Sequence, residues 1–428
     1  MTTPAHITES PPGPVTRIDG REYNYFVGTG YLGLQAHPEV IEAACEAARR
    51  YGLHSATSRA GFGNTPPTLL LERGAAEFFG CEASFYFSAG YACNRILLRA
   101  VESDFDAIFL DEHSHYSVLE AAAQSGRPTF RFGHRNGADL ADNLRRHLQP
   151  GRRPLVMTDG VFSVRGTIAP VADYCDVLGN YAGAGLLVDD AHGVGVLGDR
   201  GRGTLEHFGL FDGNVNAEVS RFGPSSPHAQ PLSQRERGDE SGVPLFGRSS
   251  ESCNSLTGTA CEQAVGHTDE RCRLFLCATL SKGLGGFGGI IPGSERFIER
   301  VRKASHWYDG ATAPPAPVTA AAARALELIR ANPDLRTRLW SNVRLLKDGL
   351  RAMGFDVDDT PVPIICLAVG NAENMQRIQR ELMVRGIAVA YMAAYSGLSV
   401  AGGLRIAVFA THTETMIQQL LDELRQVA

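Results

Sequence analysis

Short apolar runs that alternate with helical patterns limit the fold of this chain more than any other feature of its sequence. Each run is nearly continuous in apolar residues, and a stretch with helical periodicity follows it. Strands of this kind are buried on both faces, which indicates a mostly parallel sheet between two layers of helices. The strand-like runs cover 84–89, 106–111, 154–159, 185–190 and 274–280, and helical patterns cover 39–52, 115–126 and 171–183.

Polar residues stand at the carboxyl ends of these runs. In open parallel sheets, ligands bind beyond the carboxyl ends of the strands. The sequence therefore predicts a ligand site among the residues at those ends, which include Asp111, Asp159, Asp189 and Thr279.

A different pattern begins near residue 305. Two long helical stretches, 317–332 and 337–354, precede short strand-like runs and a closing helix over 413–426. This order is typical of a small α+β domain. The predicted division is an N-terminal segment over 1–40, a large domain over 41–305 and a small C-terminal domain over 306–428.

Two stretches lack such patterning. Residues 1–20 are rich in Pro and Thr, and we expect a loose arm there. Residues 211–273 combine Gly, Pro, Ser and charge, with few apolar residues in any periodic order. Loops longer than about 15 residues are uncommon in compact domains, so we interpret this stretch as a disordered insertion in the large domain.

The charge balance argues against some classes of partner. The formal net charge is -6, which gives no electrostatic reason to expect nucleic acid or an anionic membrane as a partner. No run is apolar over the length of a membrane span, and the first residues do not resemble a signal peptide. We therefore expect a cytoplasmic protein.

The cysteines do not form a recognisable ligand pattern. The chain has nine, with no C-x-x-C pair, and a chain of this size does not need disulfides. A zinc site can be imagined from residues whose spacing fits no familiar pattern, so we predict no metal. Those residues are Cys253, Cys261, Cys272, Cys277 and His267.

Three segments match the pattern G-x-G-x-x-G, which shows how weak this pattern is alone. The first, Gly28/Gly30/Gly33, follows a strand-like run, but a true dinucleotide fingerprint opens its helix within the glycines. Here the next helix begins near Pro38, and no acidic residue closes a second strand about 20 residues on. A nicotinamide-dependent enzyme therefore stays a remote alternative.

The segment VDDAHGVGVLG (188–198) ends a buried strand with Asp189 and places His192 three residues later. These residues could simply cap the following turn. A buried carboxylate needs a cationic partner, however, and a pyridinium nitrogen is such a partner. An acid held there keeps the ring protonated, which makes it an electron sink.

The segment CATLSKGLGGFGG (277–289) supplies an amine. Lys282 follows directly on a strand, and glycines after it allow the backbone to pass close to a ligand. An amine in apolar surroundings has a lowered pKa and can attack an aldehyde. The alternative is a surface loop with a solvated lysine. Together with Asp189, Lys282 favours a pyridoxal-phosphate (PLP) site.

The motifs FYFSAGYACN, DEHSHYSVLEAA, TDGVFSVRGTIAPV, VDDAHGVGVLG, TLSKGLGG and LRIAVFATHT occur in this order. In this combination the chain resembles the α-oxoamine synthases from about residue 23 to its end, except over 211–273. The resemblance implies the PLP-dependent transferase fold of type I: a mainly parallel seven-stranded sheet in a large domain, plus a small α+β C-terminal domain. It also implies a homodimer with active sites at the subunit interface.

The resemblance assigns roles at matching positions. Lys282 would hold the cofactor as a Schiff base and later act as a base, and Asp189 would pair with the pyridine nitrogen. His192 would hydrogen-bond the phenolic oxygen, and His115 would stack on the ring. The remaining implied site residues are Gly90, Tyr91, Ser163, Thr279 and Thr312 around the cofactor and Arg405 for the substrate carboxylate.

The implied reaction condenses a small L-amino acid with an acyl thioester, with decarboxylation, to an α-aminoketone. An aminotransferase of the same fold is the main alternative. Three departures from the family pattern, at Thr29, Thr68 and 395–403, lie where the substrates would bind. Neither the amino acid nor the acyl donor can be named from the sequence.

Overall fold

A seven-stranded sheet forms the centre of the protein, with the strand order β3-β9-β8-β7-β6-β4-β5. The computed structural model describes residues 6–211, 215–216, 272–393, 395, 397–398 and 400–428. Most of the predicted insertion over 211–273 therefore lies outside the described residues. The strands are β3 (Ala83–Phe87), β4 (Ala107–Asp111), β5 (Thr129–Phe132), β6 (Pro154–Asp159), β7 (Gly185–Asp189), β8 (Arg273–Thr279) and β9 (Gly289–Gly293).

The sheet confirms the predicted mainly parallel architecture. Strand β9 is antiparallel to both of its neighbours, β3 and β8, and the other strand pairs are parallel. All five runs that the sequence indicated are strands. Strands β5 (TFRF) and β9 (GIIPG) were not predicted, because both are short. The residues around TFRF include charged ones, and GIIPG is bounded by glycines.

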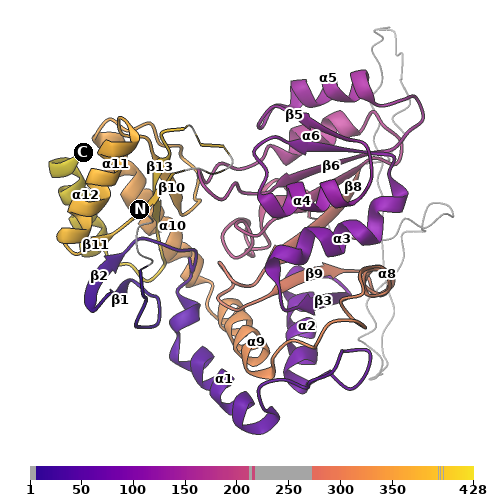
Figure 1. Cartoon of the computed structure of the whole chain (residues 1–428), viewed down its shortest axis with the longest axis horizontal. Coiled ribbons are helices and arrows are strands. Elements are labelled where there is room, and N and C mark those ends of the chain that lie inside the picture. Colours follow the sequence, from indigo (N-terminus) through magenta and orange to yellow (C-terminus); the bar gives the residue numbers. More distant parts are fainter. Residues whose placement is uncertain (1–5, 212–214, 217–271, 394, 396, 399) are drawn as a thin grey trace, which may run out of the picture. The chain divides into compact units, whose positions relative to one another are not determined.

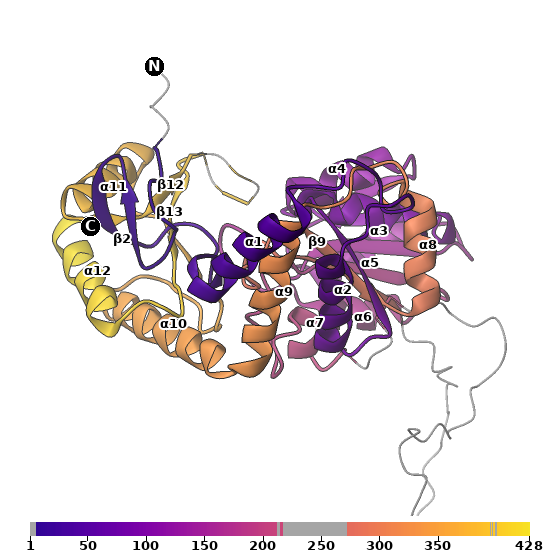
Figure 2. The same ribbon diagram turned by 90° about the horizontal axis from the view of Figure 1, so that it is seen from below.

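Helices cover both faces of the sheet (Figures 1 and 2). Side chains from alternate positions of a strand enter different apolar clusters: Phe85 and Phe87 pack with α3, α4 and α8, whereas Tyr86 packs into the cluster of the opposite face. Both sets are buried, which explains why the strand sequences are apolar throughout. The helices of this part are α1 (Pro38–Tyr51), α2 (Pro66–Phe79), α3 (Cys93–Val101), α4 (Tyr116–Gln124), α5 (Gly137–His147), α6 (Val171–Leu178), α7 (Thr204–His207) and α8 (Glu295–Ser305).

The C-terminal part contains the α+β unit that the sequence predicts. Its antiparallel sheet has the order β10-β13-β12, and α12 packs against α10 and α11. The domain boundaries at 40/41 and 305/306 stay a prediction. The elements are α9 (Ala316–Ala331), α10 (Asp334–Ala352), β10 (Ile364–Leu367), α11 (Ala372–Val384), β11 (Ile387–Ala388), β12 (Ala390–Met392), β13 (Gly403–Ala407) and α12 (Glu414–Val427).

Two local predictions were wrong. Residues 15–18, expected in a loose arm, form β1 (Val15–Ile18), which pairs with β2 (Arg21–Tyr25). Strand β2 also pairs in parallel with β11, so the N-terminal hairpin gains backbone partners from the far end of the sequence (Figure 1). Helix α6 ends at Leu178, not at 183, because Gly179 and Asn180 begin a turn there.

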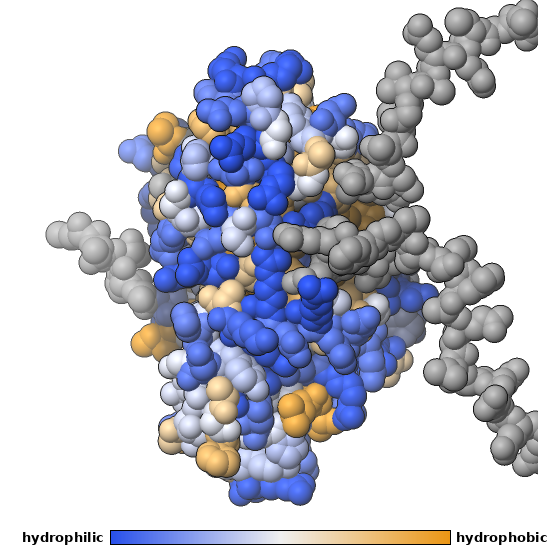
Figure 3. Space-filling model, turned by 90° about the vertical axis from the view of Figure 1, so that its right-hand side faces the viewer, coloured by the Kyte–Doolittle hydropathy of each residue, from blue (hydrophilic) through white to orange (hydrophobic). Residues whose placement is uncertain are grey.

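Figure 3 shows the hydropathy of one face of the molecule. In the view of Figure 3, hydrophilic residues predominate and apolar ones form small groups, as expected for the outer sides of amphipathic helices. None of the helices among the described residues combines the length and the apolar character that crossing a membrane requires. Within the same residues, no three His, Cys, Asp or Glu side chains form a group that could hold a metal ion.

A buried ion pair fixes the loop after α1 to α2 and β3. Arg59 donates to both carboxylate oxygens of Glu72, at 2.6 and 2.8 Å, and its guanidinium lies over the rings of Phe85 and Tyr308. The backbone N–H of Tyr86 in β3 donates to the same carboxylate at 2.9 Å. Such two-pronged, buried pairs are costly to break from one side only.

We expect Glu72→Gln to lower the free energy of unfolding by about 3 kcal/mol, because it leaves the Arg59 charge buried without a counter-charge. Urea unfolding followed by circular dichroism measures this loss. Glu77→Gln in the same helix is the matched control: it breaks a more exposed pair with Arg330 and should cost less than about 1 kcal/mol. Equal effects of the two variants would contradict the interpretation.

Candidate functional site

The carboxyl ends of the central strands bring the predicted polar residues together. Strand β6 ends with Asp159 and β7 with Asp189, and the two residues are directly opposite in the ladder. Strand β8 ends with Thr279, and Lys282 lies in the turn that follows it. Ordinary parallel pairing therefore places an amine and two carboxyl groups at one edge of the sheet.

Asp189 is buried and accepts hydrogen bonds from neutral donors. The amide of Asn94, in α3, donates to its Oδ2 at 2.5 Å, and Ser117 Oγ lies 3.4 Å from the same oxygen. The backbone N–H of Ala191 donates to Oδ1 at 3.1 Å. Asn94 also donates to Ser117 Oγ at 3.0 Å, so the two donors position each other. Sequence reasoning missed both residues, although SAGYACN and SHYS contain them.

Asp159 is buried beside this carboxylate and behaves as its neutral partner. Its Oδ2 accepts the backbone N–H of His115 at 2.7 Å. Burial, followed by the negative charge of Asp189, holds the pKa of Asp159 well above its usual range. Two carboxyl groups on adjacent strands do not both ionise readily, and the raised pKa of Asp159 favours its protonated form.

His192 is buried and uncharged. Its Nδ1 lies 2.6 Å from the phenolic oxygen of Tyr31. Burial, helped by the positive charges of Lys282 and Arg405, holds the pKa of His192 well below its usual range. Burial also raises the pKa of Tyr31 to about 12, so this phenol stays protonated and can donate to Nδ1. The ring's own proton is then on Nε2, which becomes a hydrogen-bond donor.

Lys282 differs from the other lysines of the chain. The sequence contains three, Lys282, Lys303 and Lys347. Lys303 is exposed, and Lys347 is buried in an ion pair with Asp358 at 2.5 Å. Burial lowers the pKa of the Lys282 amine, while the charge of Asp189 acts in the opposite direction. The neutral, nucleophilic form is therefore more populated than for an amine in water.

The glycines around Lys282 are needed for close packing. A Cβ on Gly283 would lie 2.7 Å from the carbonyl oxygen of Val194. Gly285 has a φ of 67°, and a Cβ there would lie 2.3 Å from the Cβ of Leu34. The turn that contains Lys282 therefore packs closely between the turn after β7 and the segment that contains Tyr31 and Leu34.

His115 caps the first turn of α4 beside these groups. Its Nδ1 accepts the backbone N–H of Ser117 at 3.1 Å. The ring of Tyr91 is edge-on to it, with centroids 5.8 Å apart, and the ring of Tyr395 is 6.2 Å away. Burial lowers the pKa of His115, which favours a neutral, stackable ring. Tyr395 belongs to the 395–403 stretch that departs from the family pattern, so that departure borders the site.

Hydroxyl groups and the start of α3 form the next part of the site. The 3-10 turn η2 (Gly90–Ala92) leads into α3, and a Cβ on Gly90 would lie 2.4 Å from Thr279 Oγ1. Thr279 Oγ1 is 2.8 Å from Ser281 Oγ and donates to the carbonyl of Gly288 at 2.9 Å. Side-chain hydroxyls and free N–H groups at a helix N-terminus are the donors that phosphate groups prefer.

Arg405 of β13 supplies a cation from the C-terminal part. It is buried, and two backbone carbonyls hold its guanidinium: Nε donates to Ser163 O and Nη1 to Gly28 O, both at 3.1 Å. The planar fork keeps further N–H groups for an anionic ligand. Sequence reasoning placed Ser163 near the cofactor, and the structure places its carbonyl against Arg405.

The remaining predicted residues have separate environments. Thr312 pairs with Ser58 in an isolated bridge, so this chain alone gives it no contact that tests a role at a partner's site. Thr68 is fully buried, with Oγ1 3.0 Å from that of Thr65. The carbonyl of Thr29 accepts the backbone N–H of Tyr31.

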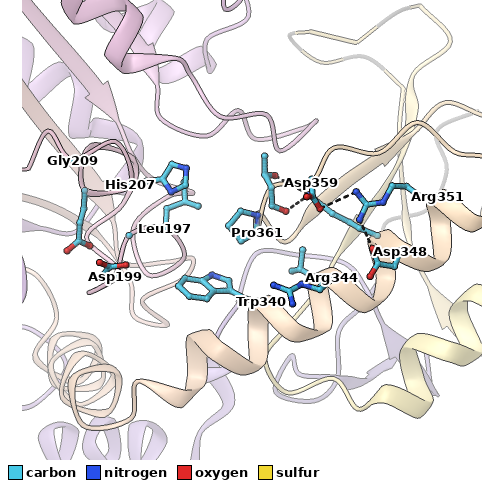
Figure 4. Close-up of a pocket in the computed structure, with 15 residues that line it drawn as sticks. Leu197, Asp199, His207, Gly209, Trp340, Arg344, Asp348, Arg351, Asp359 and Pro361 are labelled. Atoms are coloured by element: carbon cyan, nitrogen blue, oxygen red, sulfur yellow. Dashed lines mark hydrogen bonds and ion pairs between the residues drawn. The ribbon is translucent and has the colours of Figure 1, made fainter.

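A cavity of about 840 Å³ lies apart from the candidate residues, between α10 and the segment after His192 (Figure 4). Trp340 and Arg351 line it from α10, and Leu197 and His207 from the other side. Among its charged groups, Arg351 pairs with Asp348 at 2.5 Å and with Asp359 at 3.1 Å. No candidate site residue lines this cavity, so we place the functional site at the strand ends.

Comparison with known proteins supports the interpretation of this edge. The family model described as aminotransferase class I and II matches residues 29–215 and 249–424. The 8-amino-7-oxononanoate synthase of Cellvibrio japonicus is 32% identical over 98% of this chain and 90% of its own length. That of Nitrosococcus oceani is 30% identical over 98% and 96%.

Solved structures show the same fold. A serine palmitoyltransferase variant from S. paucimobilis, with a bound PLP–myriocin aldimine, superposes with a TM-score of 0.80 at 25% identity, covering 99% of this chain and 92% of that one. The 8-amino-7-oxononanoate synthase of Francisella tularensis has a TM-score of 0.68 at 21% identity, covering 94% and 96%. The predicted fold of type I is therefore confirmed, and the chain belongs to the aminotransferase class I and II family, on the α-oxoamine synthase branch that its motifs indicate.

Proposed function

We propose that this protein is a PLP-dependent acyltransferase that condenses a small L-amino acid with an acyl thioester. The expected products are an α-aminoketone, carbon dioxide from the amino acid's carboxylate and the free thiol of the acyl carrier. The observation that carries the proposal is that the buried carboxylate of Asp189 and the amine of Lys282 lie at the same edge of the sheet, where the charge of Asp189 acts on the pKa of Lys282. Similarity to 8-amino-7-oxononanoate synthases over nearly the whole chain supports it.

The residues at this edge fit PLP. Asp189 is a buried carboxylate whose side-chain hydrogen bonds come from neutral donors, so a pyridinium nitrogen would offset its charge. Lys282 would bond covalently to the aldehyde of the cofactor. Thr279, Ser281 and the N–H groups that begin at Gly90 would hold its phosphate. His115 would cover one face of the ring, beside Tyr91.

When bound, PLP supplies an electron sink for the negative charge that forms at the Cα of the amino acid. The chain's own residues control the protons around it. His192 would donate from Nε2 to the phenolic oxygen, because Tyr31 occupies Nδ1. The lowered pKa of Lys282 allows its amine to take a proton from Cα and to return it. Asp159, neutral through burial, avoids a second negative charge beside Asp189.

Arg405 is our candidate for the carboxylate of the amino-acid substrate. The carbonyls of Ser163 and Gly28 fix its guanidinium. Substrate binding would therefore cost less side-chain entropy at Arg405. A planar guanidinium binds a carboxylate through two parallel hydrogen bonds. The orientation of the substrate, and hence the bond that is broken, would depend on this contact.

We also propose a homodimer in the cytoplasm. Large apolar side chains are exposed on α1, α2 and the loop between them, and contact with a second copy would remove them from water. These side chains are Ile41, Leu53, Phe62, Leu69 and Leu70. Thr312, which is bridged to Ser58 of that loop, would then be near the partner's cofactor.

Purified protein should absorb visible light, and borohydride should fix the cofactor to Lys282. Peptide mass mapping identifies the modified lysine, and the chain offers only three. Lys282→Ala should lose the fixed cofactor, whereas Lys303→Ala, at an exposed position, should keep it. Fixation on Lys303 or Lys347 in the native protein would contradict the assignment.

Asn94→Ala should weaken PLP binding about tenfold, because Asp189 loses one of its two side-chain donors and its orientation becomes less restricted. Equilibrium titration of cofactor-free protein with PLP measures the dissociation constant. Asn143→Ala is the control, since Asn143 is a buried helical asparagine that bonds to the backbone of its own helix. An unchanged dissociation constant for Asn94→Ala would remove the positioning role.

Glycine, alanine or serine together with an acyl-CoA should release free CoA, and Lys282→Ala should abolish the release. Free thiol and aminoketone are measured over a series of acyl chain lengths. The matching family model is described as aminotransferase class I and II, so an aminotransferase is the main alternative to the proposed condensing enzyme. If an amino acid is converted to its keto acid and no thioester releases CoA, the protein is an aminotransferase and the condensation proposal fails.

A further inference from the structure

Two cysteines outside the proposed cofactor site lie sulfur to sulfur. The Sγ atoms of Cys175, in α6, and Cys272, just before β8, are 3.2 Å apart. The sulfur atoms of a disulfide are about 2.05 Å apart, so a small side-chain movement would bring these two into bonding distance. Neither residue takes part in the proposed condensation.

We propose that Cys175 and Cys272 form a reversible disulfide, with a small-molecule disulfide as the oxidant. This inference does not depend on the proposed function.

The surroundings of the pair differ from those of the other neighbouring cysteines. Cys272 is 8% exposed and packs in the apolar core, and Cys175 is partly exposed. Cys175 is therefore the more accessible of the two, and a small oxidant would approach the pair from its side. Cys93 and Cys277 also contact each other, but both are buried beside the strand ends, where an oxidant has no access. Reactivity of a thiol requires access as well as a partner.

The chemistry is thiol–disulfide exchange. The Cys175 thiolate attacks one sulfur of the small disulfide, whose other sulfur leaves as a thiolate. The Cys272 thiolate then attacks the Cys175 sulfur of this mixed disulfide and releases the second small thiol. The protein pair loses two protons and two electrons, and the oxidant's sulfur–sulfur bond is reduced to two thiols.

The bond would connect two elements that are distant in sequence. Cys175 and Cys272 are 97 positions apart, and the new link would tie α6 to the start of β8. Closing a long loop restricts the unfolded chain, so the oxidised protein should be more stable. Strand β8 carries Thr279 at its other end, so the link lies at the opposite end of this strand from the site. We therefore expect cofactor content to be unchanged.

The test treats the purified, cofactor-loaded protein with oxidised glutathione and then alkylates the remaining thiols. Peptide mass mapping should find a Cys175–Cys272 linked peptide that disappears on treatment with a dithiol. Oxidation should raise Tm by about 4 °C. Cys175→Ser and Cys272→Ser should each abolish both effects, and Cys81→Ser, which changes another partly exposed cysteine, should keep them.

Peptide mass mapping of the wild-type protein detects the disulfide directly. The test therefore does not depend on whether the cysteine variants fold. Full alkylation of Cys175 and Cys272 at oxidant levels that modify other cysteines would overturn the proposal. So would a glutathione adduct on Cys175 that never proceeds to the linked peptide, or a link from either residue to a different cysteine.

Discussion

The buried carboxylate of Asp189 is the constraint around which the edge of the sheet is organised. A carboxylate at the end of a central strand loses most of its hydration, and this cost must be offset by donors or by a cation. Asn94 and Ser117 come from two different helices to meet one of its oxygens. Asp159 on the next strand stays protonated instead of adding a second charge. The way in which α3 and α4 pack on the sheet therefore also determines the geometry of the candidate site.

The next residue, Asp190, anchors the turn that holds His192. Its carboxylate accepts hydrogen bonds from the backbone N–H and the hydroxyl of Thr204, at 2.5 and 2.7 Å. A Cβ on Gly160, Gly193 or Gly203 would lie 2.3, 2.0 or 1.9 Å from an oxygen of this carboxylate. Burial raises the pKa of Asp190 to about 7. Gly193 in VDDAHGVGVLG, together with Gly160 and Gly203, thus makes room for an internal carboxylate, which is a reason for this glycine that has no connection with dinucleotide binding.

Sequence reasoning predicted the half of the site that lies on predicted strands. Asp159, Asp189 and Thr279 end apolar runs, and parallel pairing alone brings such ends together. Asn94 and Tyr31 could not be found this way, because their roles depend on how a helix and an N-terminal loop dock on the sheet. Strand β9 was missed for a similar reason: its register between β3 and β8 is a tertiary property of a short, glycine-bounded segment.

The two halves of the candidate site come from different parts of the chain, and this division bears on two of the three family departures, Thr29 and 395–403. The groups proposed for the cofactor lie on the strands of the large sheet or in segments packed against their ends, and a shift of one strand would disturb every neighbour in the ladder. The proposed substrate side would be built from loops and from β13: Arg405 is held by carbonyls of Gly28 and Ser163, and Tyr395 borders His115. Loops tolerate change without loss of the core. Thr29 and the 395–403 stretch lie in this loop-built half, so they can alter which substrates fit while the groups around Asp189 and Lys282 stay in place.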